Sequence, residues 1–444
     1  MALIKKIIAR EVLDSRGIPT IEGILTTQDG AEVRAQVPSG ESTGKHEGIE
    51  IRDNDPLRYV GQGVKTAVSY INDAIAPKLI GVDTTLQTDI DMWLIQADGT
   101  PSYKKLGVNT MMIVSQLLLK ASAAEAKRPL YEYVNGLYNS LYNQSIQITR
   151  VPSPIYNMIN GGKHGTKNLD LQEFHLVPST SKTFSTTLEF AVSAYSGLKN
   201  LFTQRNADVS VSEEGGFTPN LFTNTEAFDI IKEVLLARKL KLGVDIYMGV
   251  DCAPEYYYKN KRYAIKDQAA ALETKEYIEF LIDAVNKYNM LIVEDPLHEE
   301  DFDGWTTITK EIGAQTYIVA DDFIAGNTER LKRAADKRAC NAVLVKFNQL
   351  GTISEMLKFI ATVREVDMKL VVSHRMGETT DATIADLGVG IQADFVKFGS
   401  PARGERIVKY NRLLEIESLI AEHGNLTNLS ASPIEEAQKQ KTSQ

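Results

Sequence analysis

The chain has 444 residues, of which 43% are hydrophobic and 24% are charged, and its formal net charge is −9. This length exceeds the roughly 250–300 residues that one hydrophobic core can serve, so we expect two packed domains followed by a short tail. The acidic balance argues against nucleic acid as the main partner, because a phosphate backbone requires a basic face.

No apolar run approaches the roughly 18 residues that a membrane span needs, and the first ten residues, MALIKKIIAR, carry charges where a signal peptide needs an apolar stretch. The two cysteines, Cys252 and Cys340, sit in apolar runs without metal-ligand spacing, which is typical of a reducing compartment. We therefore expect a cytoplasmic protein without a membrane span. A secondary pool at the cell surface or outside the cell stays open.

The first 140 residues predict a small α+β domain. Apolar and polar residues alternate over residues 7–12, 20–26 and 31–37, as in strands, and Asp29-Gly30 is a turn signal between the last two. Helical spacing follows over residues 63–76 and 109–126. An antiparallel sheet therefore opens the chain and helices follow it.

Residues 141–424 predict an α/β fold, a (β/α)₈ barrel. Six apolar runs end in a charged or hydroxyl residue, at Asp251, Glu294, Asp321, Lys346, Ser373 and Lys397. From Glu294 onward these residues are 24 to 27 positions apart, which is one strand, one helix and two loops per step. In such barrels the carboxyl ends of the strands form the active-site mouth. Residues 425–444 are rich in polar residues, which favours disorder.

Three of these strand ends are carboxylates: Asp251, Glu294 and Asp321. A single aspartate at such a position is more often a helix cap. Three in register would repel one another strongly unless a hard divalent cation lies between them, and Mg²⁺ prefers carboxylate oxygens. The pattern therefore predicts a magnesium site.

Two further strand ends are lysines, Lys346 and Lys397, and a neighbouring cation lowers the pKa of a lysine. One of them is therefore a candidate neutral base. Glu173 and Glu214 precede the regular part, and a carboxylic acid there could protonate a leaving hydroxyl. The set predicts proton abstraction beside a carboxylate followed by elimination of water.

Short stretches across the chain carry a more specific pattern. They are AREVLDSRG (9–17), VPSG-STG around Ser42, NGGKH (160–164), LQEF (171–174), EGGF (214–217), VEDPL (293–297), ADD (320–322), KFNQLGT (346–352), SHR-GET (373–379) and KYNRLLEIE (409–417). Together these stretches resemble the enolase family, over nearly the whole chain to about residue 423.

The resemblance implies a barrel of the enolase type with a smaller N-terminal α+β capping domain. It also implies a lyase, phosphopyruvate hydratase, that reversibly dehydrates 2-phosphoglycerate to phosphoenolpyruvate in glycolysis and gluconeogenesis. Two Mg²⁺ ions per active site, a small phosphorylated carboxylic acid as substrate, and a homodimer or higher homo-oligomer follow as expectations.

Residue roles also come from the resemblance, position by position. The implied magnesium ligands are Asp251, Glu294, Asp321 and, for the second ion, Ser42. The implied catalytic residues are Lys346 as base, Glu214 with Glu173 for the hydroxyl, and His164 on a closing loop. The implied substrate-binding residues are Gln172, Ser373, His374, Arg375 and Lys397.

The chain departs from the usual family pattern close to these positions. Met376 stands where the family usually has a phosphate-binding serine, and Glu41 replaces a small residue. Further departures are Glu213, Phe398, Gly404 and a DCAPEY stretch that is one residue short. Two alternatives therefore stay open: an enolase-fold lyase with a changed substrate, and a non-catalytic surface-binding protein. Retention of the candidate acids, bases and metal ligands argues against the second.

Overall fold

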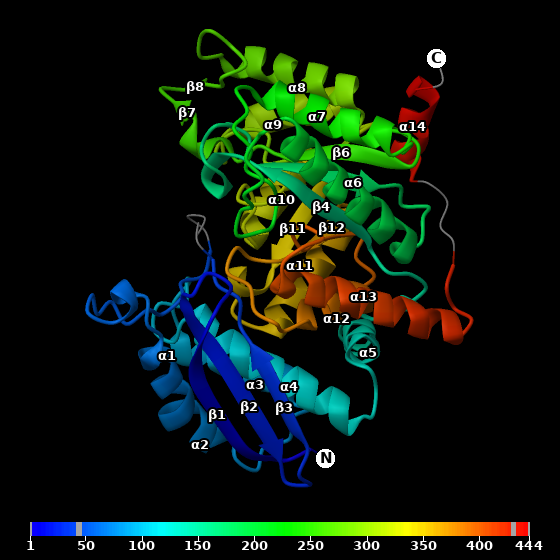
Figure 1. Ribbon diagram of the computed structural model, residues 1–444. Coiled ribbons are helices and arrows are strands. Elements are labelled where there is room, and N and C mark those ends of the chain that lie inside the picture. The colour runs from blue at the N-terminus through cyan, green and yellow to red at the C-terminus, as the bar shows by residue number, and fades with distance from the viewer. Residues whose placement is uncertain (1, 41–46, 428–431, 443–444) are drawn as a thin grey trace.

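An N-terminal unit and a barrel surrounded by helices make up the molecule (Figure 1). The computed structural model describes residues 2–40, 47–427 and 432–442. The N-terminal unit begins with an antiparallel sheet in the order β1 (Ile4–Leu13), β2 (Pro19–Thr27) and β3 (Glu32–Gln36). The three strands predicted in the first forty residues are therefore confirmed, and Gly30 supplies the φ of +96° at the turn between the last two.

Helices follow this sheet along the chain. They are η1 (Tyr59–Gly61), α1 (Lys65–Ser69), η2 (Tyr70–Ile75), α2 (Ala76–Leu79), α3 (Gln87–Asp98), α4 (Val108–Glu125) and α5 (Leu130–Tyr142). The two predicted helical segments correspond to the run from α1 to α2 and to α4. Helix α4 packs closely on β2, because a Cβ on Gly23 would lie 2.7 Å from Leu117 Cδ1.

The barrel is closed and has eight strands, as predicted. They are β4 (Ser153–Asn160), β5 (Glu173–Pro178), β6 (Ile246–Asp251), β9 (Met290–Glu294), β10 (Tyr317–Ala320), β11 (Ala342–Lys346), β12 (Lys369–Ser373) and β13 (Phe395–Lys397). Their order around the barrel is β10-β11-β12-β13-β4-β5-β6-β9. Most strand residues are buried, since the barrel interior lies on one face and helices on the other, which explains the continuous apolar runs.

The helices around the barrel are α6 (Phe184–Gln204), α7 (Asn224–Ala237), α8 (Thr274–Tyr288), α9 (Phe302–Ile312), α10 (Thr328–Lys337), α11 (Ile353–Glu365), α12 (Thr383–Gly390) and α13 (Gly404–Glu422). Short elements in the loops are η3 (Gly162–His164), η4 (Pro254–Tyr256), η5 (Phe347–Gln349), β7 (Tyr258–Lys259) and β8 (Arg262–Tyr263). Within the described ranges, no helix is long and apolar enough to cross a membrane.

One strand departs from the regular parallel repeat. Strand β5 runs antiparallel to both of its neighbours, β4 and β6. The connection from β4 to β5, residues 161–172, contains only the single turn η3, and a chain that returns without a crossover helix pairs antiparallel. The first residue of β5, Glu173, therefore reaches the mouth that the last residues of the other strands form.

The N-terminal unit is joined to the barrel through a buried carboxylate. Asp91 of α3 accepts hydrogen bonds from Ser354 N at 3.0 Å and Ser354 Oγ at 2.6 Å, at the first turn of α11. On the same helix Ile353 N donates to Ser115 Oγ of α4 at 2.9 Å. The start of α11, which follows the loop after β11, is thus held by the N-terminal unit.

Part of the chain end, for which composition predicts disorder, forms a helix against the barrel. Thr427 N donates to Thr149 O at 3.0 Å, and Pro433–Thr442 forms helix α14, which contacts the barrel. Composition favours disorder because the segment has few apolar residues, whereas residues 433–442 form a helix whose hydrogen bonds to the barrel involve residues far away in the sequence.

Candidate active site

An acidic row runs along one side of the barrel mouth. Strand register pairs Glu173 with Asp251, and Asp251 with Glu294. Asp321 directly follows the next strand, β10, and the four carboxylates are buried. Burial and the nearby Asp251 raise the pKa of Glu294 well above its ordinary value, although the Lys397 ammonium opposes them. The row therefore requires cations close by.

A row with two lysines completes the mouth. Strand register pairs Lys346 with Ser373, and Ser373 with Lys397. The Lys397 Nζ lies 2.8 Å from both carboxylate oxygens of Glu294 and 3.1 Å from Glu173 Oε2. Burial lowers the pKa of Lys397, but these carboxylates outweigh it and raise the pKa well above its usual range. Lys397 is thus a fixed cation at the centre of the acidic row.

Lys346 is paired with Asp321. Its Nζ donates to Asp321 Oδ2 at 2.5 Å, and Gln349 Nε2 donates to Asp321 Oδ1 at 3.3 Å. Burial lowers the pKa of Lys346, but the Asp321 carboxylate outweighs burial and the Arg375 guanidinium, so the pKa is raised. The expectation that a neighbouring cation lowers this lysine pKa does not hold here, because a carboxylate stands closer.

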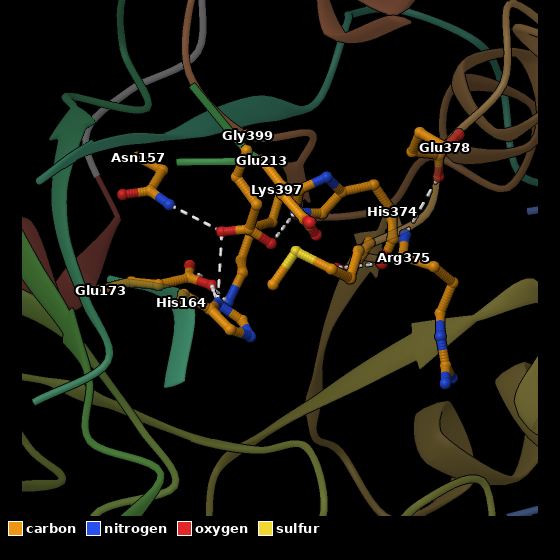
Figure 2. A network of polar contacts seen from close by, with 12 residues as sticks. Asn157, His164, Glu173, Glu213, His374, Arg375, Glu378, Lys397 and Gly399 are labelled. Carbon is orange, nitrogen blue, oxygen red and sulfur yellow. Dashed lines mark hydrogen bonds and ion pairs between the residues drawn. The ribbon is translucent and has the colours of Figure 1, made fainter. Parts of the chain in front are cut away.

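Glu214 lies among amide and imidazole groups. Its Oε2 accepts from Asn157 Nδ2 at 2.8 Å and lies 3.4 Å from His164 Nδ1, which is itself 3.0 Å from Glu173 Oε1. Figure 2 shows His164 and Glu173 turned toward one another beside Lys397. Burial lowers the pKa of His164, but the carboxylates of Glu214 and Glu173 raise it to about 10. His164 therefore carries a positive charge at neutral pH.

His374 is held in the opposite state. Its Nε2 lies 3.5 Å from Glu214 Oε1, and its Nδ1 lies 2.6 Å from Arg406 Nη1. Burial and the Arg406 guanidinium hold the pKa of His374 well below its usual range, so the imidazole is neutral. Arg406 also donates to the carbonyl oxygens of Arg375 at 2.9 Å and Met376 at 2.7 Å, and so fixes the loop after β12.

The two terminal guanidinium nitrogens of Arg375 differ in their hydrogen bonding. Nη2 pairs with Glu47 Oε2 at 2.8 Å, whereas the buried Nη1 has no hydrogen-bond partner among the described residues. Figure 2 shows the Arg375 side chain extending away from His164 and Glu173. A buried donor without an acceptor is costly, so an anionic ligand at Nη1 would be favoured.

These groups share one pocket. It is lined by Gly40, His164, Gln172, Glu173, Glu214, Asp251, Asp321, Asp322, Lys346, Ser373, His374, Arg375, Met376 and Lys397. Among the sequence-predicted site residues, Glu294 contacts this set through Lys397, and Ser42 lies outside the described residues, as does Glu41. Gln172 Nε2 donates to Asp251 Oδ2 at 3.0 Å, and Ser373 Oγ donates to His374 O.

The donor chemistry fits a magnesium ion. Asp251, Glu294 and Asp321 come from three adjacent strands and offer only hard carboxylate oxygens, which Mg²⁺ prefers. A second group of potential ligand atoms lies close together: among the described residues, His164, Glu173 and Glu214 each offer one within 4.8 Å of the others. The mixed nitrogen and oxygen set suits Mg²⁺ less well.

Sequence reasoning missed several residues of this site. Asn157 and Asn160 both donate to Glu214 Oε2, and His175 Nε2 lies 2.8 Å from Glu173 Oε2. Two amides three residues apart in a buried strand were a usable signal, because buried amides need partners. Arg406 had no local signal, since it reaches His374 from a helix 32 residues further along the chain.

A closed barrel whose mouth carries interlocked acidic and basic side chains, with an α+β unit at its loops, defines a two-domain barrel enzyme. Two family profiles match the chain: "Enolase, N-terminal domain" over residues 4–134 and "Enolase, C-terminal TIM barrel domain" over residues 148–432. The chain belongs to the enolase family.

Proposed function

We propose that this protein is a lyase that reversibly removes water from 2-phosphoglycerate to form phosphoenolpyruvate. One observation carries the proposal: Lys346 and Glu214, a base and an acid, line the same pocket from different parts of the barrel mouth. Buried cations stand beside them, so an anionic substrate has counter-charges at the reacting centre.

The two groups divide the proton transfers between them. Lys346 accepts the proton from the carbon beside the substrate carboxylate. Glu214 delivers a proton to the hydroxyl that leaves as water, while a carbon–carbon double bond forms. In the free protein the pKa of Lys346 is raised by Asp321, so Lys346 acts as a base only when another cation takes over that carboxylate.

Cations bind the anionic parts of the substrate. Lys397, already among three carboxylates, stands where a substrate carboxylate would be held, and Arg375 Nη1 is a donor suited to the phosphate. Asp251, Glu294 and Asp321 are the residues that would hold Mg²⁺. When bound, the ion supplies counter-charge as negative charge develops on the substrate carboxylate. We also propose that a second Mg²⁺ ion binds to Ser42.

Met376 supports a second candidate, the same chemistry on a different hydroxy acid. Its side chain lines the pocket beside Arg375 and cannot donate a hydrogen bond to phosphate. Glu47 already pairs with Arg375 Nη2, which leaves Nη1 for an anion. A less charged acid would lose less at this position than a phosphate dianion.

The direct test is the absorbance of phosphoenolpyruvate formed from 2-phosphoglycerate, with magnesium and with a chelator. We expect turnover with the metal only. Lys346→Ala should abolish exchange of the substrate C2 proton with solvent, whereas Glu214→Gln should retain some exchange but lose elimination. The reverse behaviour of the two variants would overturn the assigned roles. Turnover of a non-phosphorylated hydroxy acid alone would favour the second candidate.

A further inference from the structure

Helix α14 docks on the barrel through a polar face. Glu435 is 0% exposed and Gln438, one turn later, is 4% exposed, whereas their neighbour Glu436 is exposed. Ser432 Oγ accepts from Glu435 N at 3.2 Å and so caps the first turn of the helix. A buried carboxylate and a buried amide on a surface helix need specific partners, because burying them without partners is costly.

Those partners lie at the end of the barrel away from the mouth. Glu435 accepts from Ser179 Oγ at 2.6 Å and Thr180 N at 2.7 Å, directly after β5. Gln438 Nε2 donates to Met290 O at 2.7 Å, at the first residue of β9, and to Gln315 O at 2.6 Å, just before β10. Strand β5 is antiparallel, so its last residues and the first residues of β9 and β10 share one end of the barrel.

Ile434 adds one apolar contact at the same place. It packs against the cluster that fills the barrel interior, to which Tyr247 and Tyr317 belong. Figure 1 shows α14 on the side of the barrel opposite the N-terminal unit. The helix thus covers the bottom of the barrel, while the candidate active site lies at the other end.

Among the described side chains of α14, Ile434 is the one that packs against a hydrophobic core cluster. Helix α14 has ten residues, which is fewer than the roughly 12–15 that an isolated helix needs in water, so the barrel must stabilise it. Segments with few buried apolar contacts open at a lower free-energy cost than the core strands. The barrel strands, by contrast, are paired on both sides around a closed ring.

We propose that the bottom of the barrel is a docking site for a polar helical peptide, that α14 is its resident occupant, and that α14 leaves and returns as a unit while the barrel stays folded. Glu435 and Gln438 are the recognition residues of this segment. Their hydrogen-bond partners on the barrel are Ser179, Thr180, Met290 and Gln315.

Hydrogen exchange on the full chain tests the separate opening. The α14 amides should exchange at least tenfold faster than those of β9 in the same protein. Glu435→Ala should accelerate α14 exchange at least fivefold more, because Ser179 Oγ and Thr180 N lose their acceptor. Glu436→Ala, the matched exposed control, should leave the rate within twofold. Gln438→Ala serves as a second variant that removes only an amide. Exchange of α14 at the rate of β9, or equal effects of Glu435→Ala and Glu436→Ala, would overturn the proposal.

A peptide experiment tests the site itself. A labelled peptide of residues 432–442 should bind a chain that ends at Thr427 at least tenfold more tightly than the full chain, whose own helix competes. The same peptide with Glu435→Ala should bind the shortened chain at least fivefold less tightly. If the shortened chain does not fold, the full chain carrying Glu435→Ala replaces it as the acceptor. Equal binding of the peptide to the shortened chain and to the full chain, or no binding to either, would contradict the proposed docking site.

Discussion

Met376 is the residue at which this chain most clearly departs from the family pattern inside the pocket. Its carbonyl oxygen is fixed by Arg406, so the position of the residue is well defined, but its thioether offers only a weak acceptor. A phosphate next to Arg375 would therefore lack one donor. We expect Met376 to affect substrate binding more than the chemical step, because Lys346 and Glu214 lie elsewhere in the pocket.

Met376→Ser should lower KM for 2-phosphoglycerate. A charge-assisted hydrogen bond is worth roughly 1.5–3 kcal/mol, so we expect a decrease of about ten- to a hundredfold, with a smaller change in kcat. Met376→Leu, which keeps the apolar volume and adds no donor, is the matched control. Steady-state kinetics of the parent and the two variants measure KM and kcat for this comparison. An equal KM in all three would mean that phosphate does not bind beside this residue.

His164 should make stability depend on pH. Its pKa is raised to about 10 by Glu214 and Glu173 from an ordinary value of 6.5, so its stabilising charge is fully present below about pH 6.5 and is lost as pH rises through about 10. In chelator, the free energy of unfolding of the parent should exceed that of His164→Gln most at pH 6. The gap should close toward pH 10. A gap that stays constant with pH would show that the imidazolium charge contributes nothing.

Strand ends were the site residues that sequence could find, because the apolar runs mark where each barrel strand stops. Asp251, Glu294, Lys346 and Lys397 all lie where that pattern predicted. The pairing of Lys397 with Glu294 and Glu173 was not predictable, because it joins strands that are not neighbours around the barrel. The pairing of Lys346 with Asp321 joins neighbouring strands, but it also depends on side-chain conformation. The raised pKa of Lys346 follows from that pairing with Asp321.

At the scale of the elements, adjacent strand ends should act together in metal binding. Mg²⁺ that binds only the folded protein adds about 2.7 kcal/mol of stability at a concentration a hundredfold above its Kd. We expect a rise in Tm with Mg²⁺ that Glu294→Gln removes and His164→Gln retains. Scanning calorimetry with and without the ion measures it. The opposite result would move the metal to the group formed by His164, Glu173 and Glu214.

Periodicity located the first three strands, two helical segments and the ends of six barrel strands, whereas two features of the fold depend on long-range pairing. The direction of β5 depends on the short loop before it, which the regular spacing of the later strands does not reveal. Helix α14 depends on hydrogen bonds to Ser179 and Met290, which are far away in sequence. In both cases the structure depends on contacts between residues far apart in the sequence, which the local sequence pattern does not reveal.

For the molecule as a whole, Asp91 should control how firmly the N-terminal unit holds the barrel. Asp91→Ala leaves Ser354 N and Oγ without their acceptor, and each buried unsatisfied group costs about 1–3 kcal/mol. We therefore expect a lower urea midpoint. Asp89→Ala, on the exposed side of the same helix, should change the free energy of unfolding by no more than about 0.5 kcal/mol. Equal midpoints for the two variants would remove Asp91 from this role.

The closure of the barrel ring has a consequence for synthesis of the chain. Strand β4 pairs with β13, and the register partners Ser153 and Phe395 are 242 residues apart. At about 5–20 residues per second, a ribosome needs roughly 12–50 s to make that stretch. The nearby β5 can cover one side of β4 early, but the other side remains an open strand edge until β13 emerges. Lys397 and Arg406 emerge at the same late stage, so the nascent protein is exposed to aggregation and lacks a complete candidate site until almost the whole chain has been translated.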